Sequence, residues 1–295
     1  MISIAHIINP VKAQEGSELF IAQPIVFEAM RKAKAFAATI DVKLFSAQFA
    51  EDSEIFPEFF QKTKNLETTV QIKGKKKLPL IKDILQRLYD SSTAEYLIYT
   101  NTDIIVLPQF YEVVAKIIAQ GYDAFIINRR RIPKVYNSVN DLPFIYSDMG
   151  KSHPGFDCFI FKRELFPKFI LGEICVGIPF VEATIMHNLF AHAEKCKLVD
   201  DLHLTTHIGM NVMPKRDEEY YRHNRNEFEK IKKELLPLLS IEKMPYARYP
   251  YPLRIFKKAL NPAVFTMMNL ELETKSVGEK IRFLWNELRF RLLKK

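Results

Sequence analysis

The stretch Glu95-Tyr-Leu-Ile-Tyr-Thr-Asn-Thr-Asp-Ile-Ile-Val-Leu107 contains two short apolar runs separated by three polar residues. The first run predicts a buried strand over 95–100, and the second predicts another over 104–107. Between them, Asn101 and Asp103 place an amide and a carboxylate directly after a strand. In an open α/β sheet, ligands gather at the carboxyl ends of the strands. Asp103 is therefore the strongest candidate for a ligand-binding residue, and an Asp that only caps a turn is the alternative.

The segments around this stretch alternate between strand and helix patterns. Apolar periodicity predicts strands at 2–8, 41–45 and 124–128 and helices at 23–37, 79–89 and 108–120, with Pro79 in the first helical turn of its segment. This order predicts an α/β fold, with a sheet flanked by helices on both faces.

The later part of the sequence is less regular. Residues 129–156 lack a period and include Arg129-Arg-Arg131, so they predict a long functional loop. A strand is expected at 157–161, a helix at 179–193, a strand with its exit loop at 198–207 and a long helix at 218–239. A cluster of proline and tyrosine at 245–252 predicts a domain boundary near residue 240, which separates a domain at 1–240 from an extension at 241–295.

Composition excludes several classes of protein. With 295 residues, 48% of them hydrophobic and 26% charged, the chain is long enough to bury a large core. No apolar run approaches the roughly 20 residues of a membrane span, and the first residues lack a basic lead, so we expect a cytoplasmic protein. The three cysteines predict neither a disulfide framework nor a zinc site. The nine glycines form neither a dinucleotide-binding nor a P-loop pattern.

Four motifs in this order resemble the nucleotide-sugar glycosyltransferases of the GT-A fold, over residues 1–240. They are Lys77-Leu-Pro-Leu-Ile-Lys-Asp83, Tyr99-Thr-Asn-Thr-Asp-Ile104, His153-Pro-Gly-Phe-Asp-Cys-Phe-Ile-Phe161 and Asp200-Asp-Leu-His-Leu-Thr-Thr-His207. The resemblance implies that the α/β sheet is a mixed Rossmann-type sheet. The resemblance implies transfer of a sugar from a nucleotide-diphosphate donor to an acceptor hydroxyl, in the synthesis of a cell-surface glycan or polysaccharide, with a glycan or lipid-linked acceptor.

The resemblance also implies a divalent metal, Mn²⁺ or Mg²⁺, held by Asp103 and His207. Asn101 stands where the family has the first acid of an Asp-x-Asp element, facing the metal or the ribose. An amide carries no charge, so metal affinity is expected to be weaker, and Asn101→Asp is expected to tighten it. His203 precedes His207 by four residues, but on a strand or loop the two need not face one site.

Two further acids are candidate catalytic residues. Asp157 precedes an apolar strand, where a buried carboxylate needs a partner, and the resemblance implies that it contacts a sugar. Glu182 begins a predicted helix, where the helix dipole favours a negative charge. Glu182 is either a helix-end residue or the general base that deprotonates the acceptor hydroxyl.

Four residues are candidates for donor binding beside the strand ends: Lys77, Asp83, Arg129 and Arg130. Guanidinium groups suit diphosphate oxygens because two N–H groups can bind two oxygens at once. Arg130 could instead hold the acceptor.

Most of the positive charge lies near the C-terminus. The last 56 residues carry twelve Lys and Arg against five Asp and Glu, so they hold +7 of the net charge of +8. A helical stripe of apolar residues runs from Val277 to Leu292 among these basic residues. The segment predicts either contact with an anionic membrane surface or docking on the catalytic domain or on a second subunit as a homodimer. Signatures of nucleic-acid recognition are missing.

Two other functions fit the sequence. A nucleotidyltransferase acting on a sugar phosphate uses a similar sheet and a metal-binding carboxylate. A non-enzymatic basic adaptor for membranes or nucleic acid would need Asp103, Asp157 and His207 to point away from a shared cleft.

Overall fold

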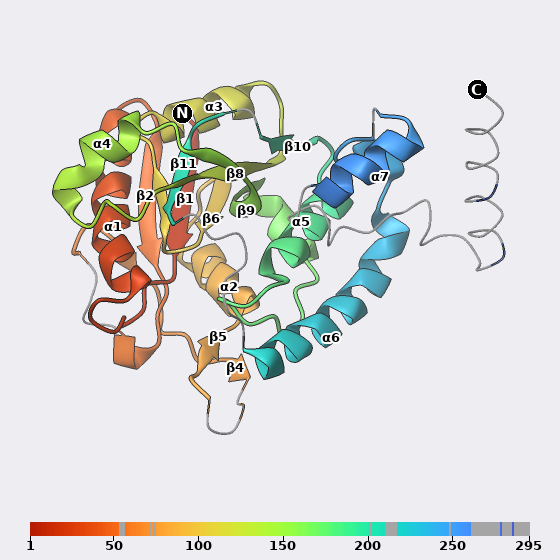
Figure 1. Ribbon diagram of the computed structural model, residues 1–295, viewed down its shortest axis with the longest axis horizontal. Coiled ribbons are helices and arrows are strands. Elements are labelled where there is room, and N and C mark those ends of the chain that lie inside the picture. Colours follow the sequence, from red (N-terminus) through yellow and green to blue (C-terminus); the bar gives the residue numbers. More distant parts are fainter. Residues whose placement is uncertain are drawn as a thin grey trace.

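The computed structural model describes residues 1–52, 57–70, 72, 75–200, 202–209, 217–247 and 249–260, together with 278 and 285. Strands and helices alternate along the chain as predicted (Figure 1). The elements are β1 (Ser3–Ile8), α1 (Glu18–Phe36), β2 (Asp41–Ser46), β3 (Gln61–Lys62), β4 (Thr69–Val70), β5 (Leu78–Pro79), α2 (Ile81–Ser91), β6 (Tyr96–Thr100), β7 (Ile104–Val106), α3 (Phe110–Ala119), β8 (Ala124–Ile132), α4 (Leu142–Ser147), β9 (Lys151–Lys162), α5 (Val181–His192), β10 (Cys196–Val199), β11 (Thr205–Ile208), α6 (Glu218–Leu235) and α7 (Tyr251–Leu260).

Nine of the described strands form one large mixed sheet in the order β3-β2-β1-β6-β9-β8-β11-β7, with β10 paired to β8, and β4 pairs with β5 in a separate two-stranded sheet. β1 runs parallel to β2 and β6, and β8 runs parallel to β10 and β11. β9 lies antiparallel between β6 and β8. The carboxyl ends of β1, β6, β8 and β11 and the beginning of β9 therefore share one edge of the sheet. This is the predicted α/β architecture.

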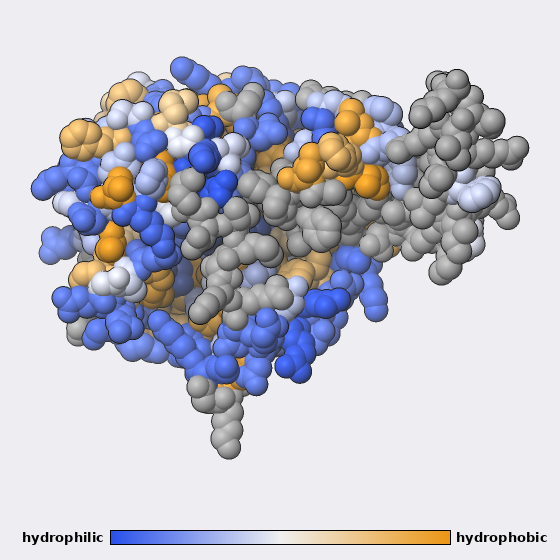
Figure 2. Space-filling view, in the orientation of Figure 1, coloured by the Kyte–Doolittle hydropathy of each residue, from blue (hydrophilic) through white to orange (hydrophobic). Residues whose placement is uncertain are grey.

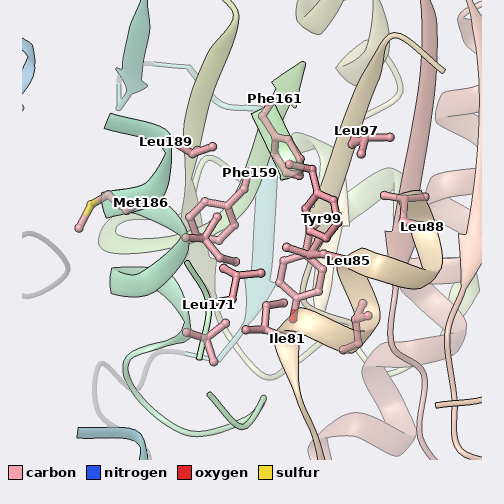
Figure 3. Packing of buried hydrophobic residues seen from close by; sticks show 14 of the residues in the cluster. Ile81, Leu85, Leu88, Leu97, Tyr99, Phe159, Phe161, Leu171, Met186 and Leu189 are labelled. Atoms are coloured by element: carbon pink, nitrogen blue, oxygen red, sulfur yellow. The ribbon is translucent and has the colours of Figure 1, made fainter. Parts of the chain in front are cut away.

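Apolar side chains pack in one layer on each face of the sheet. One core joins the sheet to α2, α5 and α6, and the other joins it to α1, α3 and α4 (Figure 1). Figure 3 shows part of the first core, in which Tyr99 lies among Leu85, Phe159 and other labelled apolar residues. All five residues of β6 are buried, because helices cover the strand on both faces.

The segment 129–156 is not the irregular loop that its composition suggested. β8 continues through the arginine run to Ile132, α4 occupies part of the connection, and β9 already begins at Lys151. Gly150 permits the tight return: its φ is +52°, and a Cβ there would lie 2.4 Å from the carbonyl oxygen of Arg131. The arginines hid the strand because three consecutive half-buried charged residues interrupt the apolar pattern, although β8 returns to the core at Ile132.

Other boundaries also differ from the sequence prediction. Pro79 belongs to β5, and α2 begins only at Ile81. The predicted strand at 198–207 is two strands, β10 and β11. The helix expected over 218–239 ends at Leu235 and is followed by a short 3₁₀ turn. The stripe at 277–292 lies outside the described residues apart from 278 and 285. Among the helices that the structure describes, none combines the length and the apolar character that crossing a membrane requires.

Candidate active site

The predicted site residues come from five different elements at the same edge of the sheet. Asp103 follows β6, Arg129 lies in β8, Asp157 lies in β9, Glu182 is in the first turn of α5 and His207 lies in β11. The antiparallel course of β9 is what brings Asp157 to this edge, since its first half runs beside the carboxyl ends of β6 and β8. The edge therefore carries acids, a guanidinium and an imidazole from distant parts of the sequence.

Asp103 and His207 form a direct pair. Nε2 of His207 lies 3.2 Å from Oδ2 of Asp103. The antiparallel pairing of β11 with β7 places His207 opposite Ile104, next to Asp103. Burial raises the pKa of Asp103, but the hydrogen bond to His207 and the charges of His207 and Arg129 outweigh this effect and lower the pKa overall. Asp103 is therefore an ionised carboxylate at neutral pH.

The pair suits a divalent cation. A carboxylate and an imidazole side by side are ligand types that divalent cations accept in proteins. Oδ1 of Asp103 is buried and makes no hydrogen bond in the described part of the chain, so it is available as a ligand. The described residues contain no group of three or more His, Cys, Asp or Glu that could hold a metal ion. Phosphate oxygens and water would complete the shell, as Mg²⁺ usually requires.

Asp157 has the partner that its buried position predicted. Its Oδ2 lies 2.8 Å from Nη1 of Arg129, and its Oδ1 accepts a hydrogen bond of 2.9 Å from Nδ2 of Asn101. Burial raises the pKa of Asp157, and the charge of Arg129 opposes that shift. Nη2 of Arg129 also donates to Nε2 of His153 at 3.2 Å. Burial and the arginine charges lower the pKa of His153 to about 3, so this imidazole is neutral.

Asn101 is held on its other side by Tyr99. The hydroxyl of Tyr99 donates to Oδ1 of Asn101 at 2.9 Å. The carbonyl oxygen that the sequence offered to a metal or a ribose therefore already accepts a hydrogen bond from the protein. Sequence reasoning missed Tyr99, because a tyrosine inside an apolar strand reads as a core residue. The signal that could have found it is a hydroxyl two residues before a polar strand end.

Glu182 lies in the first turn of α5, within electrostatic range of Asp157, Asp103 and Arg129. Burial is the largest cause, and together with the charge of Asp157 it raises the pKa of Glu182 to about 7. A carboxylate with such a pKa can accept a proton near neutral pH and is easily returned to the ionised state.

The turn before Glu182 is strained and is held by α6. Phe180 has a φ of +89°, in the left-handed region that a bulky residue rarely adopts. Its ring packs against Tyr221 and Phe228 of α6, with ring centroids 5.4 Å away in each case. Asn224, fully buried on α6, accepts from the backbone N–H of Cys175 at 2.8 Å and donates to the carbonyl oxygens of Cys175 and Pro179. The α6 helix thus fixes the loop that delivers Glu182.

Lys77 lies at the same edge of the sheet, beyond the end of β2. Its Nζ is 3.6 Å from Oε1 of Glu51 and 3.9 Å from the centroid of the Phe49 ring. Asp83 instead braces a neighbouring loop. Its Oδ2 accepts from the backbone N–H groups of Glu67 and Thr68, both at 3.1 Å, and its Oδ1 lies near Arg87. Of these two donor-binding candidates, Lys77 is the one left exposed to bind a ligand.

Arg130 and His203 are separated from the site. Arg130 contacts the segment before β9, whereas Arg129 contacts the carboxylate of Asp157. The guanidinium of Arg130 donates to the carbonyl oxygens of Met149 and Gly150. The charge of Arg130 also acts on His203, whose pKa is lowered by burial and by this charge. His203 and His207 therefore lie in different environments.

No family model and no curated protein matches the sequence. The structure of S. aureus TarS in complex with UDP aligns with a TM-score of 0.50 at 10% identity, over 96% of this chain and 78% of that one. The fold is that of the GT-A glycosyltransferases. Glucosyl-3-phosphoglycerate synthase from Mycobacterium tuberculosis, solved with Mn²⁺, UDP and glucosyl-3-phosphoglycerate, aligns with a TM-score of 0.46 at 10% identity, over 79% of this chain and 80% of that one. The GT-A architecture predicted from the four motifs is thus confirmed.

Proposed function

We propose that the chain is a glycosyltransferase that moves a sugar from a nucleoside-diphosphate donor to an acceptor hydroxyl. The observation that carries this proposal is the meeting of the Asp103–His207 pair, the Asp157–Arg129 pair and Glu182 at one edge of a GT-A sheet. The likeness in fold to TarS, which is solved in complex with UDP, agrees with a uridine-diphosphate donor.

The reaction breaks the bond between the anomeric carbon and the diphosphate and forms a bond to the acceptor oxygen. Asp103 and His207 would hold Mn²⁺ or Mg²⁺, which stabilises the charge that develops on the leaving diphosphate. Arg129 and Lys77 add positive charge for the diphosphate oxygens. Arg129 is itself oriented by Asp157. The buried Nε of Arg129 has no hydrogen-bond partner in the described part of the chain.

Glu182 would take the proton from the acceptor hydroxyl as that oxygen attacks the sugar. With its pKa raised to about 7, a substantial fraction of Glu182 is ionised at neutral pH, and its basicity is higher than that of an exposed carboxylate. A base of this kind belongs to a mechanism that inverts the anomeric centre. Asp157, whose two oxygens are both engaged, is better suited to hold Arg129 and a sugar hydroxyl than to accept the proton.

We also propose that the segment 241–295 is a basic extension that contacts an anionic membrane surface, where a lipid-linked acceptor of cell-surface glycan synthesis would lie. In α7, Leu253, Phe256 and Leu260 are 40%, 59% and 67% exposed, beside basic Arg254 and Lys257. Figure 2 shows apolar side chains gathered over this helix. Exposed apolar and basic side chains on one short helix suit an interfacial position.

Product analysis tests the proposed activity. The chain is incubated with Mn²⁺ and a panel of nucleoside-diphosphate sugars, and the released nucleotide is identified. Release of a nucleoside diphosphate supports glycosyl transfer, whereas pyrophosphate from a nucleoside triphosphate and a sugar phosphate indicates a nucleotidyltransferase. Asp103→Ala should abolish release, and His203→Ala, which changes a histidine outside the site, should not.

A further inference from the structure

Tyr99 is a fully buried residue with one polar atom, and that atom is directed to the candidate site. Its ring lies in the core between the sheet and α2 and α5, stacked on Phe159 with an interplanar angle of 19° (Figure 3). Its hydroxyl donates to Oδ1 of Asn101 at 2.9 Å. Burial, followed by the charges of Glu182, Asp157 and Asp103, raises the pKa of Tyr99 well above its usual value, so the phenol keeps its proton. The ring is held by packing, and its hydroxyl is therefore a donor at a fixed position.

Asn101 connects the Tyr99 hydroxyl to Asp157. Its Oδ1 accepts from Tyr99, and its Nδ2 donates to Oδ1 of Asp157 at 2.9 Å. An amide presents an acceptor and a donor on one rigid plane, and an ionised carboxylate such as Asp157 can only accept. Rotation of the amide by half a turn would point its oxygen at the carboxylate. The hydroxyl of Tyr99 favours the productive orientation.

Asp157 in turn holds Arg129. Nη1 of Arg129 lies 2.8 Å from Oδ2 of Asp157, so the two oxygens of this carboxylate face Asn101 and Arg129 respectively. The connected side chains are Tyr99, Asn101, Asp157 and Arg129, from β6, the turn after it, β9 and β8. The chain of contacts starts in the hydrophobic core and ends at a guanidinium beside the candidate site.

We propose that Tyr99 and Asn101 are positioning residues that orient Asp157, and through it Arg129, for the transfer reaction. This inference rests on the proposed function. It also gives a reason for an amide at position 101: an Asp there would place a carboxylate oxygen against Oδ1 of Asp157 and would lose the donor that Asp157 needs. The amide is thus matched to the neighbouring acid, rather than being a weakened metal ligand.

The first test is Tyr99→Phe, which keeps the buried ring and removes the hydroxyl alone. We expect kcat to fall by about tenfold or more, because small misplacements of reacting groups are costly, while KM for the donor and the thermal midpoint change little. Tyr96→Phe is the matched control: Tyr96 is 2% exposed on the same strand, and its hydroxyl donates to the carbonyl oxygen of Tyr122 at the other end of β6. Equal kcat values for Tyr99→Phe and Tyr96→Phe would overturn the proposal.

A double-mutant cycle separates positioning from a general loss of structure. If the Tyr99 hydroxyl acts only through the Asn101 amide, then Tyr99→Phe should cause no further loss of kcat in a chain that already carries Asn101→Ala. The double variant should then have the kcat of Asn101→Ala within about twofold. If the loss in kcat of the double variant is instead the product of the two single losses, the residues act independently and the proposal is rejected.

Failure of the proposed function can be told apart from failure of this inference. If the wild-type chain releases no nucleoside diphosphate from any donor, the proposed function fails. The positioning of Asp157 by Tyr99 and Asn101 is then tested by a crystal structure of Tyr99→Phe. In that structure the Asn101 amide should rotate, and its contact with Asp157 should lengthen beyond hydrogen-bond distance. An unchanged contact would contradict the inference, whatever the activity.

Discussion

Asp103 and His207 are in contact across the sheet, with Nε2 of His207 3.2 Å from Oδ2 of Asp103. They meet because the short strand β11 lies antiparallel to β7, which begins directly after Asp103. Gly209 keeps this arrangement open: its φ is +132°, and a Cβ there would lie 3.2 Å from Cε1 of His207. The pair is thus positioned by the pairing of β11 with β7 and by the absence of a side chain at position 209.

Replacement of His207 by Ala should weaken metal-dependent nucleotide binding. With one of the two proposed metal ligands removed, the affinity for UDP in the presence of Mn²⁺ should fall by about tenfold or more, while binding without metal changes little. Isothermal titration calorimetry with and without Mn²⁺ measures both. His203→Ala serves as the control, because His203 lies beside Arg130 and outside the site. Equal losses in the two variants would remove His207 from the metal site.

Glu182→Gln should abolish transfer and leave donor binding intact. For the wild type, the rate should rise with pH through an apparent pKa near 7, since only the ionised carboxylate accepts a proton. A pH profile of kcat measures this rise. A variant that still turns over at the wild-type rate would show that another group is the base.

The same carboxyl group should reduce stability at high pH. The pKa of Glu182 is about 7 in the folded chain, against an ordinary value of 4.5, so folding favours the protonated form. Its contribution to stability is present below pH 4.5 and is lost as the pH rises through 7. Because Glu182 is partly exposed, we expect the free energy of unfolding of Glu182→Gln to be higher than that of the wild type by only about 1–2 kcal/mol at pH 8. Urea unfolding at pH 5 and pH 8 measures the difference, which should vanish at the lower pH.

Arg129→Ala and Arg130→Ala should differ strongly, although the residues are adjacent. Arg129 holds Asp157 and lies in the site, so its loss should lower kcat/KM by about a hundredfold. Arg130 donates to carbonyl oxygens of the segment before β9, so its loss should reduce stability without a comparable effect on transfer. Steady-state kinetics and thermal unfolding of both variants test this. Equal kinetic losses would contradict the assignment of Arg129 alone to the donor.

Asn224→Ala should destabilise the loop in front of α5. The substitution leaves the buried N–H and carbonyl groups of Cys175 and the carbonyl of Pro179 without their side-chain partner. Unpaired buried groups of this kind cost about 1–3 kcal/mol each, so a loss of about 2–4 kcal/mol is expected after local relaxation. Chemical denaturation measures the loss. Hydrogen exchange should rise in residues 175–180 and stay unchanged in β1.

Substitution of Phe256 by Glu should weaken binding to anionic vesicles. Phe256 is 59% exposed on α7 and adds apolar area beside the basic residues of the extension. Sedimentation with anionic liposomes at low salt should decrease in the variant, and added salt should weaken sedimentation of the wild type. Met149→Glu, at a 62% exposed residue of another segment, is the control. If the wild type does not sediment, the extension is better tested as a dimer contact by its oligomeric state.

The alternation of strands and helices could be predicted because it depends on local periodicity. The buried strand β6 and the amphipathic helix α3 show their periods within about ten residues, and the strand-end rule then pointed to Asp103. The same local reasoning failed at Arg129-Arg-Arg131, where three half-buried arginines interrupt the hydrophobic pattern although backbone pairing continues and Ile132 returns to the core.

The sequence by itself determined the α/β class, the strand end that carries Asp103 and the need of Asp157 for a partner. Only the tertiary structure decided that this partner is Arg129 and Asn101, that Tyr99 holds the amide, and that Arg130 and His203 face elsewhere. The physical reason is that the first set of features depends on neighbours along the chain. The second set depends on sheet order and register, which bring β6, β9, β8 and β11 together and fix which side chains share an edge.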